Sequence, residues 1–86
     1  MKKQMVKILF FASLKDLVGK SEIEINLEGK ASVRDVFQKL QISYPSLKKY
    51  ENILLVAVNQ EYSNLDTPIS PNDEIAFFPP VSGGAL

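Results

Sequence analysis

The sequence contains neither cysteine nor histidine. Without cysteine, a disulfide framework, a thiolate nucleophile and a Cys-ligated metal are all excluded. Without histidine, the commonest general base and the commonest metal ligand are missing, so no Ser-His or Cys-His catalytic arrangement can form. Carboxylates, lysines, hydroxyls and the chain ends remain for chemistry. We therefore expect no metal site, and a cytoplasmic location is the default expectation for such a chain.

An excess charge and a long hydrophobic run are also missing. Ten Lys+Arg residues balance ten Asp+Glu residues, so no long-range field favours nucleic acid or an anionic membrane. No segment approaches the ~20 apolar residues of a membrane span. Near the start, Lys7 interrupts the apolar stretch and no small-residue cleavage site follows, which disfavours a signal peptide. We expect partners other than nucleic acid or a membrane.

Hydrophobic patterns predict four strands and one short edge piece. Residues 5–12 are rich in branched and aromatic side chains, and residues 22–27 alternate apolar with polar. Residues 53–58 are apolar at every position, which is typical of a strand covered on both sides. Residues 65–70 contain Pro68 and are expected to form a loop with a short edge piece. Residues 70–73 (SPND) predict a turn, with proline at its second position, and residues 74–78 form the last predicted strand.

Helical spacing and capping residues predict two helices between these strands. Ser13 can cap a short helical segment that ends at Gly19. Ser32 can cap a longer helix with Asp35 in its first turn, and Pro45 stops that helix.

The order of these elements predicts an α+β domain with the β-grasp, or ubiquitin-like, fold, in which a mixed sheet packs on one main helix. Eighty-six residues fit a single domain, which we place at residues 1–81, followed by a flexible tail at 82–86. The predicted core residues are Ile8, Phe10, Ile23, Ile25, Val36, Phe37, Leu40, Val56 and Phe77.

The C-terminal segment carries two prolines and then a Gly-Gly pair. Pro79 and Pro80 end the last strand because they donate no ladder hydrogen bond. Gly83 and Gly84 follow, and a single Gly-Gly near a chain end is by itself most often a frayed terminus.

Three stretches together make this tail informative. Residues 6–19 (VKILFFASLKDLVG), 54–60 (LLVAVNQ) and 73–84 (DEIAFFPPVSGG) resemble the small, sulfur-carrying subunit of molybdopterin synthase, a ubiquitin-like family. The likeness covers nearly the whole chain in order, and residues 73–84 are its most specific part.

The resemblance implies a carrier that is not itself an enzyme. In that family an adenylating enzyme that uses ATP activates the terminal glycine carboxylate, and sulfur then replaces the nucleotide to give a thiocarboxylate. The tail enters the large catalytic subunit, within a heterotetramer, and donates sulfur to a pterin precursor of the molybdenum cofactor. Gly84 matches the reactive glycine and Gly83 precedes it. The carrier binds no cofactor of its own.

The resemblance and the parity of the strands, meaning which alternate residues share a face, also predict a partner-binding surface. Phe11 and Phe78 fall on the outward faces of the first and last strands, which the family fold places side by side. Exposed contiguous aromatic residues usually mark an interface, although a shifted parity would make one ring part of the core. The full predicted contact set is Phe11, Phe78, Tyr62, Pro79, Pro80 and Val81.

Other functions remain open at this stage. A thiamine-type sulfur carrier, a ubiquitin-like modifier and a passive β-grasp interaction module are the alternatives. Ala85 and Leu86 depart from the family, whose members end at the second glycine, so we expect the carrier to be competent only after these two residues are removed.

Overall fold

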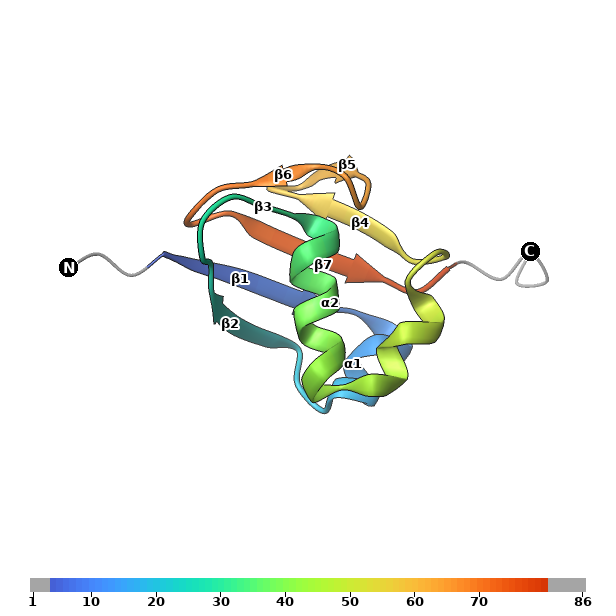
Figure 1. Ribbon diagram of the computed structural model, residues 1–86. Helices are drawn as coiled ribbons and strands as arrows, with labels where there is room; N and C mark the ends of the chain where they lie inside the picture. Colours follow the sequence, from blue (N-terminus) through green and yellow to red (C-terminus); the bar gives the residue numbers. More distant parts are fainter. Residues whose placement is uncertain (1–3, 81–86) are drawn as a thin grey trace.

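The computed structural model describes residues 4–80, and its elements are shown in Figure 1. In chain order they are β1 (Met5–Phe10), α1 (Ala12–Val18), β2 (Glu22–Asn26), β3 (Ala31–Ser32), α2 (Val33–Ser43), the 3-10 helix η1 (Pro45–Tyr50), β4 (Leu55–Val58), β5 (Glu61–Ser63), β6 (Pro68–Ile69) and β7 (Glu74–Phe78). Of the predicted domain and tail, residues 1–3 and 81–86 lie outside this range.

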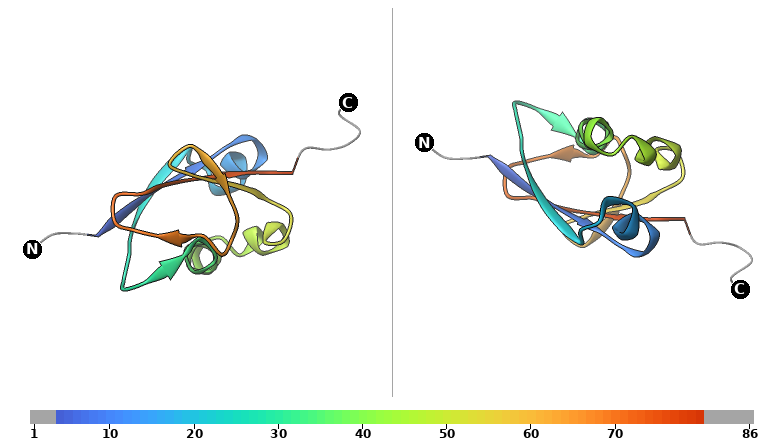
Figure 2. Two further views of the ribbon diagram at one scale, coloured as in Figure 1. Left: turned by 90° about the horizontal axis from the view of Figure 1, so that it is seen from above. Right: turned by 90° about the horizontal axis from the view of Figure 1, so that it is seen from below.

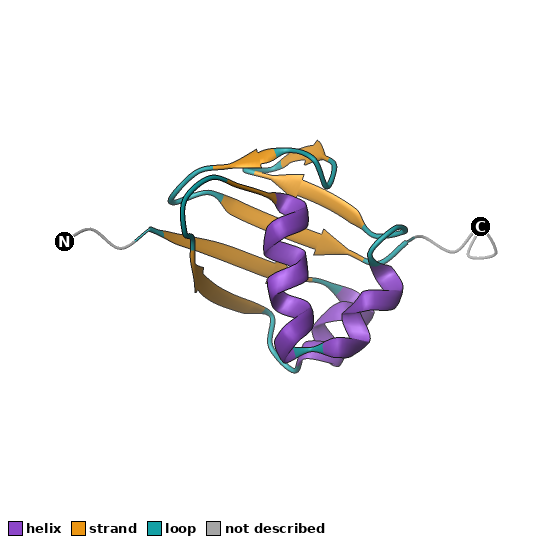
Figure 3. Cartoon of the chain, viewed as in Figure 1, coloured by secondary structure: helices purple, strands orange, loops and turns teal. Residues whose placement is uncertain are grey.

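The main sheet has five strands in the order β2-β1-β7-β4-β5. The first and last strands, β1 and β7, pair in parallel at its centre, and the other pairings are antiparallel. A separate pair of two-residue strands joins β3 to β6. Helix α2 crosses one face of the main sheet, and η1 lies on the same side (Figures 1 and 2). This arrangement confirms the predicted β-grasp architecture, a mixed sheet packed on one main helix (Figure 3).

The hydrophobic core fills the space between α2 and the sheet. Phe37 of α2 is fully buried, with its ring tilted against that of Phe77 at a centroid distance of 5.1 Å. Most of the predicted core is confirmed, but Ile23 and Ile25 are only partly buried. They lie on β2, an edge strand of the sheet, where fewer neighbours cover each side chain.

A capping residue explains where α2 begins but not where α1 begins. Ser32 and Asp35 form a reciprocal capping box: the Asp35 carboxylate accepts the Ser32 N–H at 2.9 Å, and the Ser32 hydroxyl accepts the Asp35 N–H at 3.4 Å. The predicted Ser13 cap of α1 is wrong. Phe11 precedes that helix in extended conformation, Ala12 turns the chain with φ +52°, and no side chain caps the end.

The expectation that residues 53–58 are covered on both sides holds only in part. Val56, Ala57 and Val58 are all buried, but the strand is shorter, Leu55–Val58, and Leu55 is 41% exposed. The reason is that α2 and η1 cover one face of the sheet only (Figure 2). After β4, Asn59 and Gln60 form a two-residue turn into β5, a strand that the sequence patterns missed.

Candidate functional site

The face of the sheet opposite α2 carries a continuous row of apolar side chains. In register, Leu9 of β1 lies beside Ala76 of β7, Ala76 beside Ala57 of β4, and Ala57 beside Tyr62 of β5. Paired residues on neighbouring strands share a face, so the row crosses four strands without interruption. We call this surface the outer face.

Two phenyl rings extend the outer face toward the C-terminal end of β7. The rings of Phe11 and Phe78 stack with a centroid distance of 4.6 Å and an interplanar angle of 8°. The Phe11 N–H also donates to the carbonyl oxygen of Phe77 at 3.2 Å, which holds the backbone after β1 beside β7. Phe11 is 41% exposed and Phe78 is half-buried. The prediction that both rings point outward and merge is therefore confirmed.

Tyr62 lies on the same face and is the most exposed of the aromatic residues there. Its side chain is 84% exposed, because β5 is an edge strand and no helix or strand within residues 4–80 covers its outer side. Between the aromatic residues runs a groove of about 390 Å³. It is lined by Leu9, Phe11, Ala57, Gln60, Tyr62, Glu74, Ala76 and Phe78.

The remaining predicted site residues lie at the C-terminal end. Pro79 and Pro80 follow β7 directly, Pro79 half-buried and Pro80 exposed, so they continue from the stacked rings. Val81, Gly83 and Gly84 lie outside the described residues. The structure thus brings Phe11, Phe78 and Tyr62 onto one face that leads into the two prolines.

Asp73, in the turn before β7, has a structural role. Asp73 accepts hydrogen bonds from the Ser70 N–H at 2.7 Å and from the Asn59 side chain at 3.0 Å, which ties the turn before β7 to the β4–β5 hairpin. Within residues 4–80 no group of three or more acidic side chains could hold a metal ion. The same part of the chain contains no helix with the length and apolarity needed to cross a membrane.

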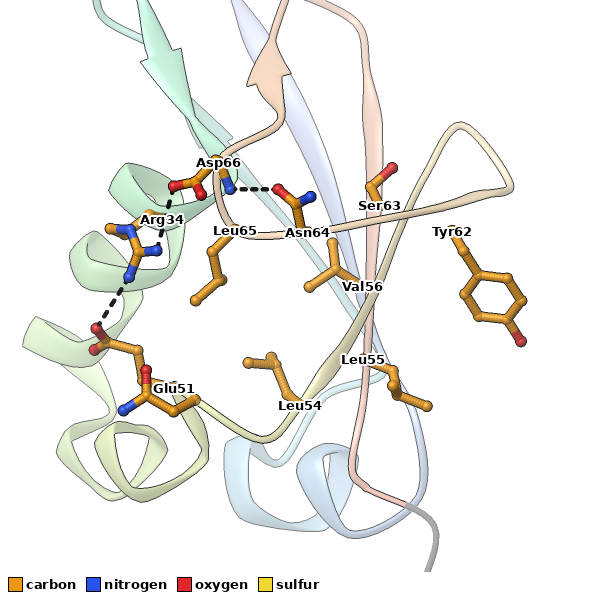
Figure 4. Close-up of a pocket in the computed structure, with 11 residues that line it drawn as sticks. Arg34, Glu51, Leu54, Leu55, Val56, Tyr62, Ser63, Asn64, Leu65 and Asp66 are labelled. Carbon is orange, nitrogen blue, oxygen red and sulfur yellow. Dashed lines mark hydrogen bonds and ion pairs between the residues drawn. The ribbon is translucent and has the colours of Figure 1, made fainter.

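A second groove, of about 500 Å³, opens between α2, β4 and the β5–β6 connection (Figure 4). The Arg34 guanidinium spans its rim, pairing with Asp66 at 3.2 Å and with Glu51 at 3.8 Å. Leu54 and Leu65 point into the space between these ion pairs and β4 (Figure 4). The residues that line this groove come from segments far apart in the sequence, so no local sequence pattern predicted the groove. Its charged side chains pair with one another.

Sequence reasoning missed two contributors to the outer face. Leu55 pairs in register with Phe78 and is exposed beside it. Gln60 lines the groove from the β4–β5 turn. The available signal was the Asn-Gln pair after an apolar run, because an Asn at such a position favours a two-residue hairpin and hence a further strand.

Comparisons with known proteins agree with this architecture. The family model described as the ThiS family matches residues 8–84. The molybdopterin synthase sulfur carrier subunit of Dictyostelium discoideum is 44% identical over 81 residues, covering 91% of this chain and 94% of that protein. The solution structure of small archaeal modifier protein 1 from Methanosarcina acetivorans has a TM-score of 0.79 at 27% identity, covering 98% of this chain and 100% of that one.

A third comparison includes a partner. The chain is similar to part of a complex of subunits 1 and 2 of the molybdopterin-converting factor from Helicobacter pylori, with a TM-score of 0.63 at 26% identity, covering 93% of this chain and 99% of that chain. The resemblance inferred from the sequence is thereby confirmed. The chain belongs to the ThiS family and is a relative of the molybdopterin synthase sulfur carrier subunits.

Proposed function

We propose that this chain is the sulfur carrier of a molybdopterin synthase and delivers sulfur from Gly84 during molybdenum cofactor biosynthesis. The observation that carries the proposal is the exposed stack of Phe11 and Phe78, which leads through Pro79 and Pro80 toward the Gly-Gly pair. The 44% identity to a named sulfur carrier subunit supports it.

The chemistry is that of an activated carboxylate. Hydrolysis of the Gly84–Ala85 peptide bond first frees the Gly84 carboxylate. This carboxylate attacks the α-phosphate of ATP, pyrophosphate leaves, and an acyl-adenylate forms. Hydrosulfide then displaces AMP from the acyl carbon and leaves a thiocarboxylate. On delivery, the thiocarboxylate sulfur displaces an oxygen substituent from a carbon of the pterin precursor. Water then cleaves the acyl–sulfur bond, which leaves the sulfur on the pterin and returns the Gly84 carboxylate.

The two activities that this scheme requires belong to partners. The chain carries no Gly-rich phosphate-binding loop, so ATP binds to an adenylating enzyme. Glycines suit a tail that threads a narrow channel, because they have no Cβ. The catalytic site for sulfur transfer belongs to the large subunit, which docks on the outer face. The complex of subunits 1 and 2 from Helicobacter pylori supports such a partner.

Intact-mass analysis tests the carrier step. A chain that ends at Gly84 is incubated with the adenylating enzyme, ATP and hydrosulfide. The expected product carries one sulfur in place of one oxygen, and it should not form when ATP is replaced by an analogue that cannot be cleaved between the α- and β-phosphates. An unchanged mass in the complete reaction would contradict the proposal and favour a passive interaction module.

A second candidate is a protein modifier, since small archaeal modifier protein 1 has nearly the same fold. Both functions begin with the same acyl-adenylate, but a modifier ends in an isopeptide bond to a lysine. Incubation of the activated chain with hydrosulfide and a lysine-rich acceptor protein distinguishes them. The carrier proposal expects thiocarboxylate to accumulate, whereas a modifier would give a covalent conjugate.

A further inference from the structure

Gln60 adopts a backbone conformation that its side chain disfavours. Asn59 and Gln60 form the β4–β5 turn with φ values of +51° and +72°. Two consecutive residues with positive φ are typical of the hairpin turn in which Asn followed by Gly is most favourable. Asn tolerates the left-handed region because its short side chain bonds locally, but Gln has no such advantage. A glycine at position 60 would suit this turn better.

The side chains of the two turn residues differ in their hydrogen bonding. The Asn59 carboxamide donates to Asp73 at 3.0 Å and accepts the Glu74 N–H at 3.0 Å, so it stabilises the fold. The Gln60 side chain is exposed, and within residues 4–80 its carboxamide makes no hydrogen bond. In the described part of the chain, no side-chain hydrogen bond of Gln60 therefore offsets its backbone strain. Strain of this kind persists mainly where the residue has a function.

The position of Gln60 indicates what that function is. Its side chain lines the outer-face groove beside Tyr62, on a surface that is otherwise mostly apolar. Apolar surface gives affinity without direction, whereas a hydrogen-bonding group fixes the orientation of a partner. A carboxamide carries both a donor and an acceptor, which matches the acceptor and donor of a peptide group.

We propose that Gln60 is a specificity-determining residue of the outer face, whose carboxamide hydrogen-bonds a backbone peptide group of the docked large subunit. The inference rests on the proposed function, because it takes the large subunit as the occupant of this face.

The test compares two variants that each place a glycine at a position of positive φ. Gln60→Gly removes the side chain from the groove. Asn72→Gly is the matched control, because Asn72 also has a positive φ, +74°, but does not line the groove. Thermal unfolding reports stability, and isothermal titration with the large subunit reports the dissociation constant.

We expect neither glycine variant to lower the melting temperature. The Gln60→Gly chain should bind the large subunit about tenfold more weakly, the effect of losing one neutral hydrogen bond, while Asn72→Gly should bind as the unaltered chain does. Binding by Gln60→Gly within twofold of the unaltered chain would overturn the inference. So would a drop in its melting temperature, because the turn would then need the side chain.

A third variant separates this inference from the proposed function. Phe78→Ala removes the aromatic stack at the other end of the same face. If Phe78→Ala weakens binding and Gln60→Gly does not, the docking face is correct and the role of Gln60 is wrong. If neither variant weakens binding, the docking face itself is wrong.

Discussion

Replacing Phe78 with alanine should weaken partner binding far more than it weakens folding. The Phe78 ring is half-buried in the free chain. The exposed ring of Phe11 covers part of it, with the two ring centroids 4.6 Å apart. Both rings line the groove of the outer face, on the side of the sheet away from α2. Loss of the Phe78 ring therefore opens no cavity between the sheet and the helix.

The magnitudes follow from this placement. A stacked aromatic pair contributes about 0.5–1.5 kcal/mol beyond its buried area, and truncation of a fully buried Phe costs about 3–5 kcal/mol. Because Phe78 is half-buried, its replacement by alanine should lower the free energy of unfolding by about 1–2 kcal/mol. A central aromatic residue of an interface contributes 2 kcal/mol or more, so the dissociation constant should rise at least about 30-fold.

Two measurements check these values. Urea unfolding gives the stability of the single variants Phe11→Ala and Phe78→Ala and of the double variant, and the cycle should return a coupling of about 0.5–1.5 kcal/mol. Isothermal titration with the large subunit gives the loss of affinity. A dissociation constant within about threefold of the unaltered chain, or an unfolding loss above about 3 kcal/mol, would refute the reasoning, because the ring would then belong to the core.

Three further predictions concern the core, the main helix and the tail. Phe37→Ala should lower the free energy of unfolding by about 3–5 kcal/mol in urea titrations, since Phe37 is fully buried against Phe77, and a loss under about 1 kcal/mol would contradict the packing. Ser32→Ala should cost about 1 kcal/mol by breaking the capping box with Asp35, and an unchanged unfolding midpoint would show that the cap is dispensable. A chain ending at Gly84 should support ATP–pyrophosphate exchange with the adenylating enzyme. The full-length chain should not, because two extended residues move the carboxylate by roughly 6.6–7 Å, and equal exchange by both would refute this.

Local patterns predicted most of the secondary structure. The type and order of β1, α1, β2, α2, β4 and β7 follow from periodicities of 2 and 3.6 residues, which depend only on neighbouring residues. Turn chemistry was equally local: Pro71 and Asn72 form the turn before β7, closed by the Asp73 N–H bonding the Ser70 carbonyl at 3.1 Å. The predictions failed where the pattern was short, as at the three-residue strand β5.

The exposure of a side chain was less predictable than its element. Leu55 belongs to an apolar run, yet it is exposed, because within residues 4–80 the helices α2 and η1 pack against the opposite face of the sheet. Ile23 alternates correctly along β2 but is only partly buried at the sheet edge. A strand pattern indicates which residues share a face, whereas burial depends on what packs against that face.

The sequence by itself determined the carrier motif, with Gly84 after two prolines, and the outward parity of Phe11 and Phe78 along their own strands. Only the tertiary structure decided that these strands are neighbours, that the two rings stack, and that Tyr62 and Gln60 complete the same face. The reason is that parity is a property of one strand, while the pairing of β1 with β7 brings together residues more than sixty positions apart. Pairing and register between distant strands are set by packing of the whole sheet against α2.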